Sequence, residues 1–260
     1  MAEKTIDSDQ RENESVFRVV TYNIHKGIGG IDRRYRPQRI IDALAHCEAD
    51  IVLMQEVDDN VPRSKFDYQV ELFSDALGMK HHAFRRTVQL KQGHYGNAIL
   101  SRFPISEVFD VDLTIPFKKS RRALLAHCKL RHLGHERTLW IANVHLGLAG
   151  FERKIQLRRL LQNDLLRRTH RKTPLVIAGD FNDVWGSLGK QIMHPAEFAI
   201  AGPRIKTFPA AVPVRGLDRV FYRGDLQVDH AFSCRTEISR QASDHLPLVV
   251  DFRLLTEPHE

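Results

Sequence analysis

Residues 175–182 read LVIAGDFN, an apolar run that ends in polar residues. Its apolar, β-branched start predicts a strand that is buried on both faces of a sheet. Asp180 and Asn182 follow at the point where such a strand would reach the edge of its sheet. The segment therefore predicts a core strand that delivers polar side chains to a sheet rim.

Four other segments along the chain share this construction. Each follows or touches a run of apolar and β-branched residues, and together they carry Tyr22-Asn23, Gln55-Glu56, Asn143-Val144-His145 and Ser243-Asp244-His245. Amide, carboxylate and imidazole groups gathered from five strand ends are the groups of a hydrolytic site built around a divalent cation.

The rest of the chain alternates strand-like runs with amphipathic helices. Short turns between consecutive strands favour an α/β fold of two packed β-sheets flanked by helices over one doubly wound parallel sheet. We predict helices at 37–50, 67–77, 151–169 and about 186–193, and strands at 17–23, 51–57, 96–102, 105–113, 122–131, 138–146, 175–182, 217–222, 228–234 and 247–254.

Length and composition are those of an ordinary globular protein. The 260 residues are 42% hydrophobic and 27% charged, which suits one large domain. We predict that this single domain covers 15–256 and follows a disordered, polar tail at 1–14. The formal net charge of +7 favours polyanionic partners: nucleic acid, an anionic phospholipid surface or a phosphorylated small molecule.

Two features predict a cytoplasmic protein without a transmembrane segment. The apolar runs are too short to cross a bilayer, and the polar first residues contain no secretory signal. Cys47, Cys128 and Cys234 are far apart in the chain, and we expect them to be buried free thiols of a reducing compartment.

Glu56 and Asn23 are candidate ligands for a hard cation. Mg²⁺ takes one or two carboxylates and keeps several waters for the phosphate oxygens of a substrate. Taken singly, Glu56 would ordinarily be a solvated edge residue and Asn23 a turn former.

Asp180 and Asn182 are candidates for activating a water molecule. If the strand continued to Asn182, both side chains would point to one face, with Asp180 accepting a proton and Asn182 holding the water or a phosphate oxygen. The alternative is an Asx turn that closes the strand.

Two histidines are candidates for contact with a phosphate group. His245 can bind a phosphate oxygen or transfer a proton, provided that a carboxylate such as Asp218 fixes its tautomer. A salt bridge from Asp218 to Arg215 or Arg219 is the alternative. His145 can share the charge that develops on the transferred phosphoryl group.

In their order along the chain, these motifs resemble those of the endonuclease/exonuclease/phosphatase superfamily, which includes exonuclease III, deoxyribonuclease I, neutral sphingomyelinases and inositol polyphosphate 5-phosphatases. The resemblance spans about residues 17–254 and is closest to the small bacterial members. It also covers Gly96–Ser101 and Leu217-Asp218-Arg219. It implies a four-layer αββα sandwich and Mg²⁺-dependent hydrolysis of a phosphoester by in-line attack of water, with Mn²⁺ as an alternative ion.

The resemblance also implies roles for single residues. Glu56 would bind the metal with Asn23, and Asp244 would contribute on the metal side. Asp180, aided by Asn182, would be the base or the group that positions water.

In the same resemblance, His145 and His245, the latter oriented by Asp218, would stabilise charge on phosphorus. Whether Asp180 or His245 takes the proton stays open at this point.

Three functions remain in competition. The leading one is a phosphodiesterase that cleaves DNA or RNA, favoured by the positive charge. The second is the same chemistry on a phospholipid or small phosphoester, for which the apolar segment VDLTIPFKK at 111–119 is a candidate membrane contact. The third is a non-catalytic binding module that retains the fold.

Overall fold

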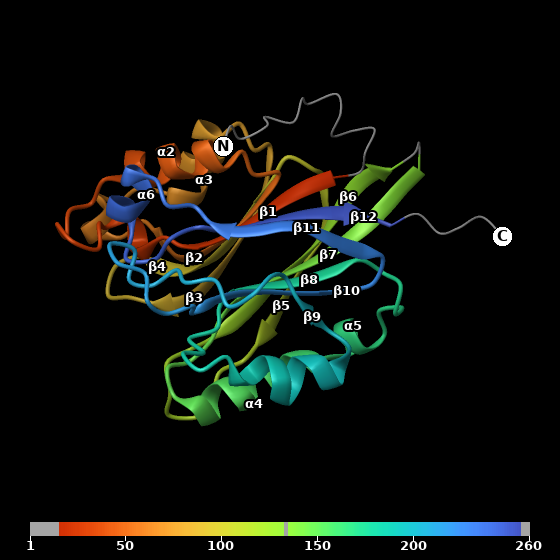
Figure 1. The fold of residues 1–260 in the computed structure, drawn as a ribbon. Coiled ribbons are helices and arrows are strands. Elements are labelled where there is room, and N and C mark those ends of the chain that lie inside the picture. Colours follow the sequence, from red (N-terminus) through yellow and green to blue (C-terminus); the bar gives the residue numbers. More distant parts are fainter. Residues whose placement is uncertain (1–15, 133–134, 256–260) are drawn as a thin grey trace.

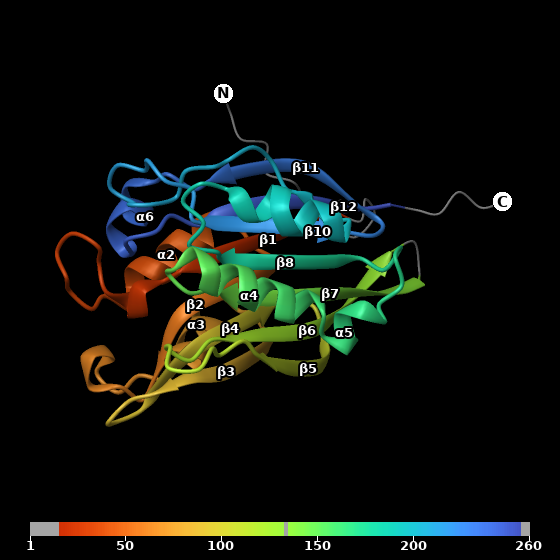
Figure 2. The same cartoon turned by 90° about the horizontal axis from the view of Figure 1, so that it is seen from below.

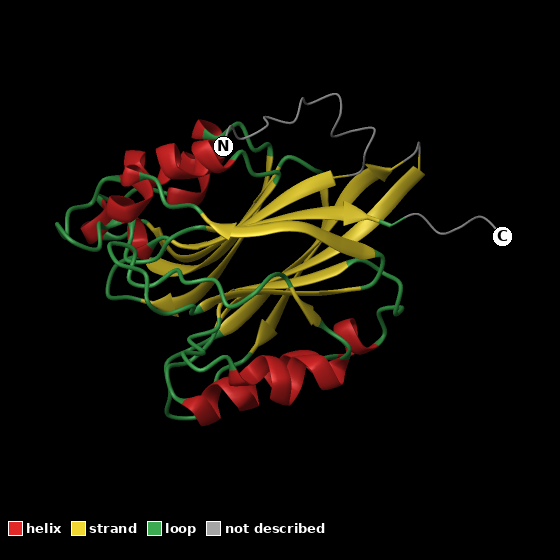
Figure 3. Ribbon diagram, in the orientation of Figure 1, coloured by secondary structure: helices red, strands yellow, loops and turns green. Residues whose placement is uncertain are grey.

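The computed structural model describes residues 16–132 and 135–255. Two six-stranded sheets pack face to face, and helices cover the outer face of each (Figure 1, Figure 3). The predicted four-layer αββα sandwich is therefore confirmed. The tail predicted at 1–14 lies outside the described residues.

The first sheet has the strand order β11-β12-β1-β2-β4-β3. Its central pair, β1 and β2, is parallel, and its other neighbours are antiparallel. The strands are β1 (Val16–Asn23), β2 (Ile51–Asp59), β3 (His81–Gln89), β4 (His94–Ser101), β11 (Leu226–Ser233) and β12 (Leu248–Leu254).

The second sheet has the order β5-β6-β7-β8-β10-β9 and repeats this plan. Its central pair, β7 and β8, is parallel, and the remaining pairs are antiparallel. The strands are β5 (Ile105–Asp112), β6 (Arg122–His132), β7 (His135–His145), β8 (Leu175–Asp180), β9 (Ala199–Ile200) and β10 (Asp218–Arg223).

The main core lies between the two sheets. It contains Val19 and Leu53 from the first sheet and Ile141, Val176 and Ala178 from the second, all essentially inaccessible to solvent. Burial of such side chains contributes roughly 1.5–3 kcal/mol each, so the facing sheets supply a large part of the stability.

Helices cover the two outer faces. On the first sheet lie α2 (Pro37–Cys47), α3 (Gln69–Ala76) and α6 (Glu237–Ala242); on the second lie α4 (Gly150–Leu161) and α5 (Asp164–Arg167), as Figure 2 shows from below. The short helical turns are η1 (His25–Gly27), η2 (Pro62–Ser64), η3 (Gly189–Met193) and η4 (His194–Ala196). None of the helices in the described ranges is long and apolar enough to span a bilayer.

Helix α2 shows how the sequence sets these layers. Pro37 opens it, where a missing backbone N–H costs nothing. Ile40, Leu44 and Cys47 recur at helical spacing and are buried against the first sheet.

The predicted helix at 151–169 is wrong as a single element. The chain forms α4 and then α5, because Asn163 ends the first and caps the second: its side-chain oxygen accepts a hydrogen bond from the Leu165 N–H at 3.0 Å.

The strand β3 was not predicted at all. It is an edge strand in which Ala83 alone is buried, so its sequence HHAFRRTVQ lacks the apolar alternation of a core strand.

Candidate active site

Strand register gathers the polar strand ends at one rim. Asn23 lies beside Gln55 in the first sheet, and His145 and Asp218 both lie beside Asp180 in the second. The two rims meet, because the Asn23 Nδ2 atom donates a hydrogen bond to Asp180 Oδ2 at 3.1 Å. Residues far apart in sequence thus form one site.

A buried pair of amides joins the sheets beneath this site. Gln55 Nε2 donates to Asn143 Oδ1 at 2.8 Å, and Asn143 Nδ2 donates to the carbonyl oxygens of Met54 and Ala98, each at 2.8 Å. Both amide side chains are fully buried. Gln55 and Asn143 therefore fix the distance between the sheets rather than face a substrate.

Asp180 is the hub of the site. Its Oδ1 atom accepts the Asn182 backbone N–H at 2.9 Å, and its Oδ2 atom lies 3.6 Å from His145 Nε2 and 3.8 Å from His245 Nε2. Burial raises the pKa of Asp180 to about 6, although the nearby His245 opposes the rise. This carboxylate is poised to exchange a proton near neutral pH.

His245 is held by a carboxylate in the way the sequence suggested. Its Nδ1 atom lies 2.9 Å from Asp218 Oδ2, and the Thr207 hydroxyl donates to the same carboxylate oxygen. Burial alone would lower the pKa of His245, but Asp218 and Asp180 raise it to about 10. The imidazole is therefore protonated and directs Nε2–H into the site. Arg219 bonds instead to the backbone oxygens of Asp218 and Asp183.

His145, in contrast to His245, is a neutral imidazole. Burial, and next the nearby Arg121 guanidinium, hold its pKa well below the ordinary value. A neutral and a protonated imidazole thus flank Asp180, which gives the site groups that can both donate and accept protons.

Glu56 reaches the rim through a break in its strand. Its backbone φ is 58°, and the pairing of β2 with β4 shifts register between Met54 and Val57. Such a bulge re-aims one side chain. Burial would raise the pKa of Glu56, but the positive charge of Lys26, whose ammonium donates directly to the carboxylate, helps to lower it.

Asp244 lies at the same rim with a partly exposed side chain. Its Oδ1 atom is 3.9 Å from His25 Nδ1, and the preceding Ser243 hydroxyl donates to the Asn23 carbonyl at 2.7 Å. The segment before β12 is thereby tied to the end of β1.

The donor set fits a hard cation that keeps most of its waters. Glu56 is an ionised carboxylate already paired with a cationic group, Lys26, and Asn23 and Asp244 add oxygen atoms at the same rim. Across the described ranges, no group of three or more His, Cys, Asp and Glu side chains forms a metal-binding cluster. A cation bound by one or two carboxylates, an amide and water would not require one.

Asn182 departs from the geometry expected of it. β8 ends at Asp180, and Asn182 has a φ of 50°, so the alternation of a strand does not extend to it. An Asx turn closes the strand instead, and the Asn182 side chain donates to the Leu146 carbonyl at 3.0 Å. Asn182 still lies beside Asp180, because its backbone N–H closes the turn on the Asp180 carboxylate.

Three cationic residues lie near the candidate site, two of which, Lys119 and Arg121, belong to a basic cluster that the sequence suggests for an anionic groove. Lys26 was not expected, because its left-handed turn in η1 depends on tertiary contacts. Arg121 is 6% exposed, and its Nε atom has no hydrogen-bond partner among the described groups. Lys119 lies 4.8 Å above the Tyr95 ring, and both Lys119 and Arg121 influence the pKa of His145.

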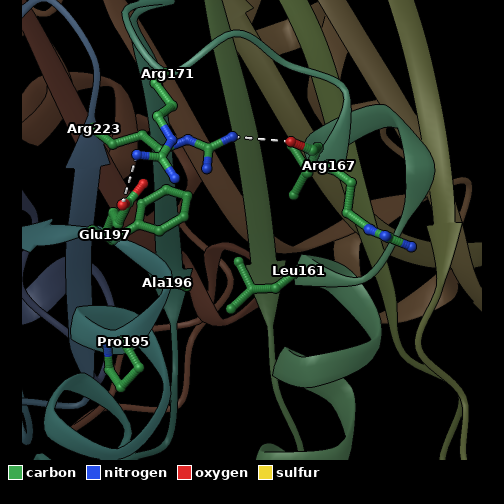
Figure 4. A pocket seen from close by; sticks show the side chains of 9 residues that line it. Leu161, Arg167, Arg171, Pro195, Ala196, Glu197 and Arg223 are labelled. Carbon is green, nitrogen blue, oxygen red and sulfur yellow. Dashed lines mark hydrogen bonds and ion pairs between the residues drawn. The ribbon is translucent and has the colours of Figure 1, made fainter.

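A cavity of about 310 Å³ lies at the other end of the second sheet (Figure 4). It is lined by Leu161, Phe198, Arg223 and their neighbours. Arg223 pairs with Leu175, whereas Asp218 pairs with Asp180, so about 17 Å of strand separates this cavity from the candidate site. The cavity belongs to a different part of the surface.

The sequence matches the model of the Endonuclease/Exonuclease/phosphatase family over residues 20–245. The chain belongs to this family, whose members are hydrolytic phosphoesterases that generally use divalent metal ions. It is also 30% identical to the uncharacterized protein YbhP of Escherichia coli K12, over 95% of this chain and 99% of that protein.

Two solved structures show the same fold. The endonuclease/exonuclease/phosphatase from Beutenbergia cavernae superposes with a TM-score of 0.78 at 23% identity, covering 95% of this chain and 73% of that one. The human Nocturnin catalytic domain, with bound sulfate, superposes with a TM-score of 0.73 at 24% identity, covering 94% and 96%. At these identities the similarity is one of fold.

Proposed function

We propose that the protein is a divalent-metal-dependent phosphodiesterase that hydrolyses its substrate by in-line attack of water. The observation that carries the proposal is the environment of Asp180, a buried carboxylate between a neutral and a protonated imidazole. Such a group can take a proton from water at neutral pH.

Glu56, with Asn23 and Asp244, would hold the ion, which is Mg²⁺ in this proposal and Mn²⁺ as the alternative. When bound, the ion neutralises charge on the phosphate oxygens. Asn23 comes from the end of β1, Glu56 from the bulge in β2, and Asp244 from the segment before β12.

The reaction follows from the positions of the other groups. The water oxygen forms a bond to phosphorus while the bond to the leaving oxygen breaks, and the proton of the water passes to Asp180. His245, protonated and held by Asp218, donates a hydrogen bond to a phosphoryl oxygen. His145 and Arg121 stabilise the same charge. Asn182 keeps Asp180 oriented through its backbone N–H.

The proposal assigns proton acceptance to Asp180 rather than His245. A histidine whose pKa is raised to about 10 carries its proton already and cannot accept another near neutral pH. The leading substrate expected from the charge of the chain, nucleic acid, and the cytoplasmic location both stay predictions.

The test uses a soluble diester, bis(p-nitrophenyl) phosphate, with Mg²⁺ or Mn²⁺. We expect hydrolysis that EDTA abolishes and that Asp180→Asn lowers by about 100-fold or more. Asp229→Asn, which removes a carboxylate paired with Arg253 on the first sheet, is the matched control and should leave the rate unchanged. Wild-type protein that binds Mg²⁺ but cleaves no diester would favour the non-catalytic alternative.

A further inference from the structure

Six loops around the candidate site each expose a large apolar side chain. They follow β1, β2, β7 and β8, or precede β6 and β10. Their exposed side chains, here called the apolar tips, are Ile31, Phe66, Phe117, Leu148, Trp185 and Val214.

Strand register places all six loops at one end of the sandwich. β7 and β8 end at the site, and β6 and β10 begin there, because Leu124 pairs with Asn143 and Asp218 with Asp180. β1 and β2 end at the same rim. The apolar tips therefore all lie on loops at the end of the sandwich that carries the candidate site.

The exposure of these tips is unusually complete. Phe117 is 106% exposed at a φ of 63°, Trp185 is 82% exposed and Leu148 is 77% exposed. Single exposed hydrophobic residues need no explanation, but several gathered on one face mark an interaction surface.

Exposed cations flank four of the six tips. Arg33 and Arg34 follow Ile31, Lys65 precedes Phe66, Lys118 and Lys119 follow Phe117, and Arg215 follows Val214. The Phe117 loop is braced, since Lys118 pairs with Glu152 at 3.0 Å and lies 5.4 Å above the Phe151 ring. Apolar tips beside cations match a surface with an apolar interior and anionic headgroups.

We propose that this rim docks on an anionic phospholipid membrane and that the substrate is a phosphodiester in a lipid headgroup. The proposal rests on the proposed hydrolase function and names the substrate class of that site. The tips enter the interface, with Trp185 at headgroup level, and the flanking cations contact lipid phosphates. The site, which lies at the same end of the sandwich, then faces the headgroup layer.

The chemistry of the tips favours lipid over polynucleotide. Single-stranded nucleic acid binds by stacking bases on aromatic side chains along a basic groove. Phe66, Phe117 and Trp185 could stack, but Ile31, Leu148 and Val214 cannot. Aliphatic side chains contribute binding free energy when they enter the hydrocarbon region of a membrane.

The experiment measures binding to vesicles without requiring catalysis. The protein used is Glu56→Gln, so that binding is measured apart from turnover. It is sedimented with vesicles that mix neutral and anionic phospholipid. Purely neutral vesicles and a fluorescent oligonucleotide are the parallel arms. We expect binding to the anionic vesicles that weakens about tenfold in the triple variant Phe117→Ser, Leu148→Ser, Trp185→Ser. The control is Val108→Ser with Leu255→Ser, which removes exposed apolar side chains from β5 and from the residue that follows β12, and it should bind as tightly as the parent.

Circular dichroism establishes that both variants are folded before binding is compared. Absence of binding to anionic vesicles, equal losses in the triple variant and its control, or a loss confined to the oligonucleotide arm would each overturn the membrane assignment. Those results would leave the hydrolase itself standing, because its own test uses a soluble diester.

Discussion

His245 Nδ1 and Asp218 Oδ2 lie 2.9 Å apart, and this contact joins the segment before β12 in the first sheet to β10 in the second. Both side chains are almost fully buried. The pair does two things at once: it closes the rim between the sheets, and it keeps one imidazole charged beside Asp180.

Asp218→Asn should lower the pKa of His245 from about 10 toward its ordinary value, because the largest favourable charge is removed while burial remains. We expect kcat on a soluble diester to fall about 100-fold. The His245 pKa is measured by NMR titration of the metal-free protein. Asp225→Asn, which removes a carboxylate paired with Arg137 away from the site, is the control and should change neither quantity.

The same pair makes stability depend on pH. The folded pKa of His245, about 10, lies above the ordinary histidine value of 6.5 expected in an unfolded chain. Its contribution is therefore fully present below about pH 6.5 and is lost as the pH rises through about 10. Unfolding in urea should show this loss in the parent and a weaker one in Asp218→Asn; identical pH profiles would contradict it.

The rate of hydrolysis should rise with pH as Asp180 loses its proton. Burial raises the pKa of Asp180 to about 6, and a bound cation would shift it downward, so the acidic limb of kcat should lie at or below about pH 6. The residual rate of Asp180→Asn should lack this limb. A limb that persists in Asp180→Asn belongs to another group and would remove Asp180 as the base.

The core strands and the residues at their ends could be predicted from sequence because the signal is local. An apolar run such as LVIA before Asp180 indicates a buried strand by its composition alone. The polar residues that follow such a run lie at the edge of the sheet, whichever strands are its neighbours. Order along the chain then supplied the fold through a family resemblance. The roles of the single site residues and the single domain at 15–256 stay predictions.

The features that sequence did not reveal depend on tertiary context. The positive φ of Asn182 and the bulge at Glu56 arise where a strand must end or bend at the rim. Lys26 contacts Glu56 from the turn η1, and the local sequence does not predict the conformation of that turn. The edge strand β3 needs only one buried face, so its composition resembles that of a loop.

Asn143→Ala should destabilise the protein by about 2–3 kcal/mol, because Gln55 and two backbone carbonyls lose buried hydrogen bonds at once. Thermal and urea unfolding measure the change. Gln38→Ala removes an exposed amide paired with Asp42 and should stay within about 0.5 kcal/mol of the parent. Equal effects of the two substitutions would mean that the amide bridge does not hold the sheets together.

Lys26→Met should tighten the binding of Mg²⁺ or Mn²⁺ by about fivefold to tenfold. The Lys26 ammonium donates to the Glu56 carboxylate, so an incoming cation must displace it and then bear its repulsion. Two like charges about 4 Å apart repel by roughly 1 kcal/mol in water and by more near a protein surface, which sets the size of the effect. Isothermal titration calorimetry measures the affinity, with Lys65→Met as a control in a neighbouring loop and Glu56→Gln as the variant that should lose binding. Unchanged or weaker metal binding in Lys26→Met would show that the ion does not use the carboxylate oxygens that Lys26 contacts, and the assignment of Glu56 as a ligand would fall with it.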